Sequence, residues 1–284
     1  MAAKFGPAGN AASFTAMGYK TSLQVPEYLT KMGLDAFEYQ CGRGVNIGQE
    51  KAAELGRLVR EKNITLSLHA PYYISMSSVE EEKRQNSVQY ILASAKAVSA
   101  MGGSRIVVHT GSCGKISREQ ALELAKDTMK KALSALDEAG LGGVHICPET
   151  MGKINQLGTL YEVLELCRLD ERLIPCIDFG HLNARSLGGL KQFEDYKKIF
   201  IEIENALGLE RLRQYHAHFS KIEYTTGGEK RHLTFEDTVF GPNFEPVLEL
   251  TVQKGCSPTI ICESAGTQAE DAKTMKNYYD ALLA

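Results

Sequence analysis

The sequence lacks the features that mark membrane-spanning, secreted and disulfide-stabilised proteins. No apolar run reaches the roughly eighteen residues that a membrane-spanning helix needs. The first ten residues, MAAKFGPAGN, contain no hydrophobic core of a signal peptide. The seven cysteines are odd in number and form no CxxC pair, which favours reduced, mostly buried thiols. We therefore expect a cytoplasmic protein that makes no contact with a membrane.

The chain also lacks a strong excess of one charge. Its 32 basic and 35 acidic residues give a formal net charge of -3, which argues against a protein that coats nucleic acid through a basic surface, although a local basic face is compatible with it. We find no linker, low-complexity tract or short-period repeat. A length of 284 residues is usual for one closed α/β barrel. Residues 1–284 are therefore expected to form a single domain.

Short β-rich runs alternate with longer helical patterns along the chain. Several of the short runs are continuously apolar, such as Ile106-Val107-Val108, as in parallel strands that are buried on both faces. Ser117 is expected to open a helix, and Gly33, Gly140 and Gly255 to end three others. Eight strands in strict alternation with eight helices predict a single (β/α)8 TIM barrel, an α/β fold. The expected strands are 4–6, 36–40, 64–69, 105–109, 144–149, 174–178, 214–219 and 259–263, and the expected helices are 26–32, 49–62, 79–100, 117–139, 160–168, 190–207, 245–254 and 268–283.

From the third to the eighth, each expected strand carries a potential metal ligand at or near its carboxyl end. In a (β/α)8 barrel these ends meet at one rim, where barrel enzymes place their chemistry. A buried carboxylate there also carries a desolvation cost, which a cation or hydrogen bonds must offset. One such residue would more often be a hydrogen-bonded structural group, but six strand ends together favour a metal centre. The candidate ligands are His69, His109, Glu149, Asp178, His181, His216, His218 and Glu263.

The mixture of imidazole and carboxylate ligands indicates which metal would bind. It suits zinc, manganese or iron, whereas calcium and magnesium prefer oxygen ligands alone. The ligands exceed what one tetrahedral ion takes, so we expect two or three ions. A bridging carboxylate, for which Glu149 is the best candidate, would hold two ions about 3.5–4 Å apart, an arrangement suited to hydrolysis of a phosphoester. Glu149 is also the candidate catalytic residue, because it would bridge the metals or manage the proton.

Four motifs carry a resemblance to a known family: LHAPY at 68–72, VVHTG at 107–111, PETMGK at 148–153 and IDFGHLNAR at 177–185. Their order and their placement at strand ends resemble the endonuclease IV family, the apurinic/apyrimidinic endonucleases of the xylose-isomerase-like barrel superfamily. The resemblance runs over nearly the whole chain. It implies three Zn²⁺ ions and, as the partner, duplex DNA that the enzyme cuts 5′ to an abasic site during DNA repair.

The resemblance also implies a role for individual residues. The first ion would be bound by His69, His109 and Glu149. The second would be bound by Glu149, Asp178, a histidine of the seventh strand and Glu263, and the third by His181 with partners from the loop after that strand. Tyr72 matches an aromatic residue that enters the DNA stack; the alternative is an ordinary surface tyrosine.

The chain departs from the family pattern in two places. Its seventh strand reads His216-Ala217-His218-Phe219-Ser220-Lys221, and aligning the last three residues favours His218 over His216 as the ligand. The family's Asp-x-His partners of the third ion are replaced by Glu229 and His232, which are three residues apart. The loop after the second strand is glycine-rich, and Arg43 could take the place of the family's DNA-probing side chains.

A sugar isomerase or epimerase of the same superfamily is the alternative function. It would use one metal ion to polarise a carbonyl, and Glu38 could face into its pocket. Histidines from three different strands weigh against it, and a non-catalytic metal-binding scaffold would need only one closed site. The basic residues of the loops at this face either meet a DNA backbone or are merely solvated; they are Arg43, Lys115, Lys153, Arg185, Lys221, Lys230 and Arg231. One intact active face is compatible with a monomer, which we expect.

Overall fold

The computed structural model describes residues 2–284, in which eight parallel strands close into a barrel. The strands form two sheets of four, in the orders β1-β10-β7-β6 and β2-β3-β4-β5. Parallel bridges between Ala8 and Glu38 and between Glu149 and Cys176 join the two sheets at both seams. The predicted (β/α)8 barrel is therefore confirmed. Its strands are β1 (Lys4–Pro7), β2 (Ala36–Gln40), β3 (Thr65–His69), β4 (Arg105–Val108), β5 (His145–Pro148), β6 (Cys176–Asp178), β7 (His216–Phe219) and β10 (Thr259–Cys262).

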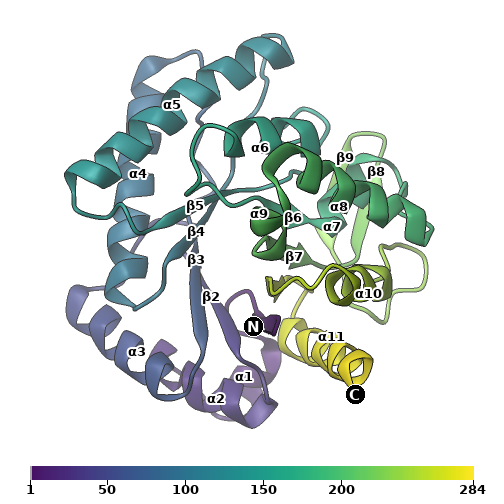
Figure 1. Cartoon of the computed structure of the whole chain (residues 1–284). Coiled ribbons are helices and arrows are strands. Elements are labelled where there is room, and N and C mark those ends of the chain that lie inside the picture. Colours follow the sequence, from purple (N-terminus) through teal and green to yellow (C-terminus); the bar gives the residue numbers. More distant parts are fainter. Residues whose placement is uncertain (1) are drawn as a thin grey trace.

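Helices surround the strands as an outer ring, and the chain returns so that its last helix packs against its first strand (Figure 1). The eight helices expected from the sequence are all present, most of them shifted by a few residues at their ends. They are α2 (Val25–Met32), α3 (Gln49–Glu61), α4 (Glu81–Ala100), α5 (Arg118–Glu138), α6 (Leu160–Cys167), α8 (Phe193–Leu207), α10 (Glu245–Gln253) and α11 (Gln268–Leu283).

Local capping chemistry explains several helix boundaries. The Ser117 side chain accepts a hydrogen bond from the Gln120 backbone N–H, and the Gln120 side chain bonds back to the Ser117 N–H, so α5 begins with a capping box. Gly33 ends α2 in the left-handed conformation, which costs a residue without Cβ little. These helix signals, predicted from the sequence, are confirmed.

Several short elements were not predicted. They are α1 (Ala12–Ala16), α7 (Phe179–Arg185), α9 (Leu209–Arg213), the 3₁₀ turn η1 (Ser22–Gln24) and an antiparallel hairpin of β8 (Ile222–Thr225) and β9 (Gly228–His232). Each spans at most seven residues, too few for a clear hydrophobic period. Two of them, α7 and the hairpin, carry residues of the candidate site.

Most of the apolar core lies between the barrel and its helices, and a small separate cluster of Val107, Cys147, Ile174 and Cys176 is buried apart from it. All seven cysteines are buried and free within the described residues, in agreement with the expected reduced thiols. Over the same residues, no helix combines the length and apolar character that spanning a membrane demands.

Candidate metal centre

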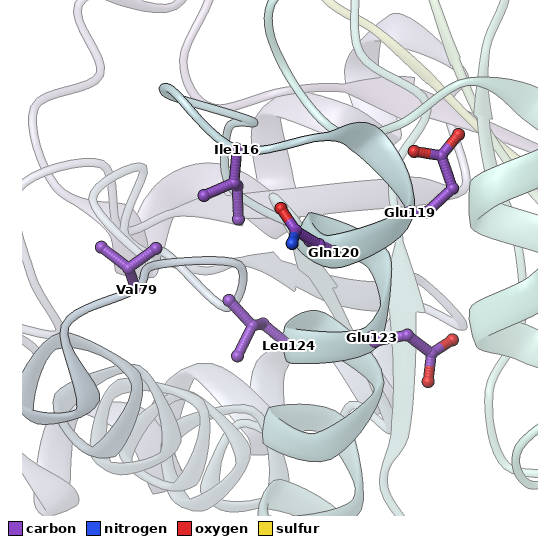
Figure 2. A pocket seen from close by; sticks show the side chains of 6 residues that line it. All are labelled: Val79, Ile116, Glu119, Gln120, Glu123 and Leu124. Carbon is purple, nitrogen blue, oxygen red and sulfur yellow. The ribbon is translucent and has the colours of Figure 1, made fainter.

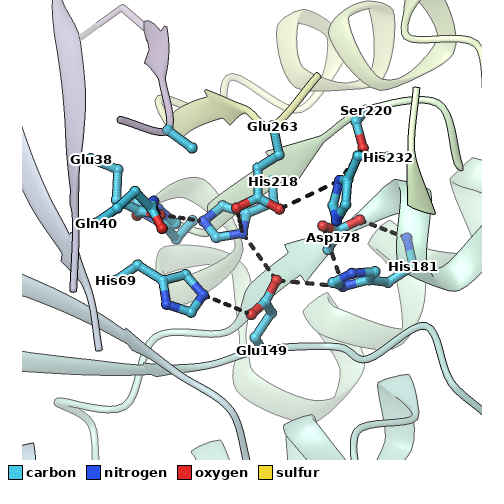
Figure 3. Close-up of polar contacts among 12 residues, drawn as sticks. Glu38, Gln40, His69, Glu149, Asp178, His181, His218, Ser220, His232 and Glu263 are labelled. Carbon is cyan, nitrogen blue, oxygen red and sulfur yellow. Dashed lines mark hydrogen bonds and ion pairs between the residues drawn. The ribbon is translucent and has the colours of Figure 1, made fainter. Parts of the chain in front are cut away.

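The histidines and carboxylates at the strand ends converge at the mouth of the barrel (Figure 3). All of them except Asp178, His216 and His218 line a pocket of about 330 Å³, together with Tyr72, Gln40, Gly42, Met151, Lys153 and Gln156. A larger hollow, of about 590 Å³, lies on the outside beside α5 and is lined by Val79, Ile116, Leu124 and three polar residues (Figure 2). That outer hollow contains no histidine or cysteine. The chemistry therefore belongs to the smaller pocket.

Glu149 lies at the centre of the cluster, and its two carboxylate oxygens face different neighbours. Its Oε2 atom is 3.4 Å from His69 Nε2 and 3.2 Å from His109 Nε2. Its Oε1 atom is 3.0 Å from His218 Nδ1. Only 1% of Glu149 is exposed, so these contacts are shielded from solvent. The carboxylate thus belongs to two neighbouring sets of potential ligands, as a bridging group would.

The second set is made of Glu149, Asp178, His218 and Glu263, whose ligand atoms all lie within 4.8 Å of one another. His218 Nδ1 is 3.6 Å from Glu263 Oε1. The structure therefore places His218, the residue favoured by the alignment, among the predicted ligands. His216 lies deeper in the same strand, where its Nε2 atom is 3.0 Å from Glu38 Oε2.

The third set contains His181, Glu229 and His232. His181 Nε2 is 3.4 Å from Glu229 Oε2, and His232 Nε2 is 3.9 Å from Glu229 Oε1. In a regular strand, residues three apart point to opposite faces. Here Tyr224 pairs with Glu229 and Glu223 with Arg231, so β9 contains one extra residue, a β-bulge. The bulge restores a shared face to Glu229 and His232.

Hydrogen bonds to the backbone orient the ligands in a manner typical of metal sites. Nδ1 of His69 contacts the Ala70 carbonyl at 2.8 Å, and Nδ1 of His181 contacts the Thr150 carbonyl at 2.9 Å. Each ring then directs its Nε2 atom toward the cluster, where a bound cation would replace the proton. Asp178 accepts the His181 N–H through Oδ1 at 2.6 Å, while its buried Oδ2 and the Oε2 atom of Glu149 have no hydrogen-bond donor in the described residues. Buried oxygens without a hydrogen bond fit bound cations.

The electrostatics of the cluster also call for positive charge. Burial raises the pKa of the Asp178 carboxyl to about 6, against the opposing effect of His181. Burial likewise favours the neutral form of His69, but the Glu149 carboxylate beside it raises the pKa of His69 to about 9. Imidazole protons thus compensate the buried carboxylates. Divalent cations would supply the same charge when bound and would release those protons.

The remaining candidate residues lie around this pocket. Tyr72 lines it and is 57% exposed, on the loop after β3. Arg43 is exposed on the loop after β2 and does not line the pocket. Glu38, expected as a residue that could face a small substrate, is instead 0% exposed and lies beneath the pocket. Sequence reasoning missed Gln40, at the end of β2, and Met151 and Gln156, on the loop after β5, as lining residues, because such polar and sulfur side chains carry no distinctive signal.

Most of the basic residues expected at this face form hydrogen bonds or ion pairs with other residues of the protein. Arg185 donates to the carbonyl groups of Met151, Lys153, Ile154 and Gln156, and so holds the loop after β5. Lys221 donates to two carbonyl groups of the loop after β9. Lys230 and Arg231 both pair with Glu223, at 2.6 Å. Arg185 and Lys221 are therefore structural, whereas Lys230 and Arg231 form exposed ion pairs. Lys153 is the basic residue that lines the pocket.

The fold and these three sets of ligands define a (β/α)8 barrel with a histidine- and carboxylate-rich mouth. The chain belongs to the xylose isomerase-like TIM barrel family, whose sequence profile matches residues 26–281. An uncharacterized protein of Methanocaldococcus jannaschii is 36% identical over 252 residues, which cover 89% of this chain and 90% of that protein. A probable endonuclease 4 of Acholeplasma laidlawii is 28% identical over 181 residues, 61% of this chain and 60% of the relative's length. The similarity to endonuclease IV proteins is therefore confirmed. The matched region spans less than two thirds of the length of this relative.

Solved structures of two kinds share the fold. A D-tagatose 3-epimerase-like protein superimposes with a TM-score of 0.71 at 20% identity, covering 99% of this chain and 100% of that one. Endonuclease IV from Thermus thermophilus superimposes with a TM-score of 0.69 at 19% identity, covering 99% of this chain and 98% of that one. At these identities the likeness shows the fold alone, and the substrate has to be argued from the site.

Proposed function

We propose that this protein is a zinc-dependent phosphodiesterase that hydrolyses the DNA backbone 5′ to abasic sites. The observation that carries the proposal is the contiguity of three ligand sets, His69–His109–Glu149, Glu149–Asp178–His218–Glu263 and His181–Glu229–His232. A sugar epimerase that polarises one carbonyl needs a single ion. Three adjacent cations suit a phosphoester, whose attacking, leaving and non-bridging oxygens all carry charge in the transition state.

Each group at the site would have a separate role in hydrolysis. Bound divalent ions would activate water and stabilise negative charge on the phosphate oxygens. Glu149 would hold two of the ligand sets together through its separate oxygens. Lys153, in the pocket lining, would attract the phosphate. Tyr72, exposed at the rim, would pack against the bases beside the lesion.

Removal of the metal provides the direct test. Protein stripped with a chelator should leave a duplex with one abasic site intact, and reloading with Zn²⁺ should restore a nick on its 5′ side. Elemental analysis of the same samples should find two or three ions per chain. A fully loaded protein that leaves the duplex uncut would exclude the DNA substrate, and a single ion per chain would favour the epimerase.

A Tyr72→Ala variant is expected to weaken binding of the abasic duplex on the order of 10- to 100-fold, because stacking contributes roughly 1–3 kcal/mol per base. Fluorescence anisotropy with a labelled duplex would measure the change. Tyr161 is a matched control, since it is 64% exposed on α6 and does not line the pocket. Equal losses in Tyr72→Ala and Tyr161→Ala would contradict a stacking role.

The epimerase is a second candidate, because the pocket of about 330 Å³ is of a size that holds a small molecule. The position of Glu38 weighs against this candidate. Its carboxylate is fully buried and does not line the pocket, so it is not placed to transfer a proton to or from a sugar. Incubation of the metal-loaded protein with ketohexoses, followed by chromatography of the sugars, would test this candidate directly.

A further inference from the structure

A buried polar network lies directly beneath the ligand sets, inside the barrel wall. Its centre is Glu38, which is 0% exposed on β2, and it includes two histidines of β7 that are also 0% exposed. A charged carboxylate without contact to water is costly unless donors surround it. The function of this network is not explained by substrate binding, because Glu38 does not line the pocket.

Three donors surround the Glu38 carboxylate, and the His218 ring lies beside it. Its Oε2 atom receives the Ser67 hydroxyl at 2.9 Å and lies 3.0 Å from His216 Nε2. Its Oε1 atom lies 3.0 Å from His218 Nε2 and 3.3 Å from the Gln40 amide nitrogen. Hydrogen bonds from β2, β3 and β7 thus hold Glu38 in place, and its Oε1 atom also faces His218 Nε2, which has no hydrogen-bond partner in the described residues.

This arrangement determines which face His218 offers to the pocket. An ionised carboxylate only accepts, and each ring nitrogen of His218 faces one, so a cation that takes Nδ1 would leave the ring proton on Nε2, beside Glu38. The opposite nitrogen, Nδ1, is 3.0 Å from Glu149 Oε1 and 3.6 Å from Glu263 Oε1. Figure 3 shows His218 between Glu38 on one side and Glu149 on the other.

We propose that Glu38 is a positioning residue that fixes the tautomer and orientation of His218, so that Nδ1 is free to bind the second metal ion. The proposal rests on the metal centre of the proposed function but not on its substrate. His216 supports the same anchor from below, because its Nε2 atom lies 3.0 Å from Oε2 of Glu38.

The competing use of this network is a separate metal site. Cys176, His216 and His218 bring ligand atoms within 4.8 Å of one another. Two features favour the positioning role instead. Both histidines direct Nε2 at Glu38, and His218 can offer Nδ1 to the pocket only while Nε2 stays protonated.

A Glu38→Gln variant tests the proposal. Glutamine has one carbonyl oxygen, and its amide group would meet an imidazole N–H, so His218 is expected to shift its proton to Nδ1 and lose its ligand atom. The expected result is a 10- to 100-fold weaker affinity for one Zn²⁺, the range typical when such a carboxylate partner is lost, with the other ions retained. Competition with a chromophoric chelator measures this in the absence of any substrate.

Cobalt substitution supplies a readout that general destabilisation would not change. The visible d–d bands of the Co²⁺ protein should shift in Glu38→Gln and stay unchanged in Tyr215→Phe, a control next to the same strand that loses only the buried hydrogen bond to Thr251. If Glu38→Gln does not fold, Ser67→Ala, which removes one donor to Glu38, should show a smaller loss of affinity in the same direction.

Unchanged affinity and spectra in the folded variants would overturn the proposal. A thiolate-to-cobalt charge-transfer band that disappears in Cys176→Ser would overturn it as well. Loss of metal affinity without any DNA cleavage by the wild type would refute the proposed substrate and leave this inference standing.

Discussion

A Glu149→Gln variant is expected to lose about 10³-fold or more in turnover, because the charged bridge between two ligand sets disappears. The amide has nearly the shape of the carboxylate, so packing is retained. The amide nitrogen, however, is a donor and cannot bind a cation. In one orientation of the amide it would face His69 and His109, and in the other it would face His218. At least one ion per chain should be lost with it. Steady-state kinetics on an abasic duplex and elemental analysis of the same preparation would measure both effects.

Asp271→Asn is the matched control for this variant. Asp271 is a buried carboxylate, 8% exposed, that accepts hydrogen bonds from the Phe235 N–H and the Thr267 hydroxyl. It does not line the mouth pocket, so its variant should keep its metal ions and its turnover. A Glu149→Gln protein that stays folded, keeps its full metal content and cuts at the wild-type rate would contradict the bridging role.

The ligand sets at the strand ends could be anticipated because of one geometric property of the fold. Parallel strands in a closed barrel bring their carboxyl ends to one rim. His69, His109 and Glu149, at the ends of three successive strands, therefore had to meet if the strands were correctly assigned. The choice of His218 over His216 followed from the alignment of Phe219-Ser220-Lys221, because the period of two along a strand puts both histidines on one face. Both residues point into the barrel, and only their depth separates them.

The third ligand set could not be derived from spacing. Glu229 and His232 are three residues apart, which in a regular strand predicts opposite faces. The bulge that brings them together depends on how β8 and β9 pair across the hairpin, a non-local property that neither strand encodes alone. The same limitation applies to Arg185, whose carbonyl partners lie some thirty residues earlier in the sequence.

Two glycines connect the hairpin to the loop after β5, and they make the third ligand set sensitive to a single methyl group. Gly228 has a φ of 90°, and a Cβ atom placed there would lie 2.2 Å from the Gly152 carbonyl oxygen. Since that neighbour is backbone, it cannot rotate away as a side chain would. Close contact of the two backbones thus positions Glu229, which immediately follows Gly228, against His181.

Gly228→Ala is therefore expected to move the hairpin away from the loop and to remove one metal ion per chain while two remain. The positive φ and the clash should also lower the free energy of unfolding, with about 1–3 kcal/mol from the backbone strain. Elemental analysis and chemical denaturation of the apo protein would separate the two effects. Gly227→Ala is the matched control, since a Cβ there meets only the Thr225 hydroxyl at 3.7 Å. If Gly228→Ala keeps every ion, or if Gly227→Ala loses one as well, the close backbone contact does not position the third ligand set.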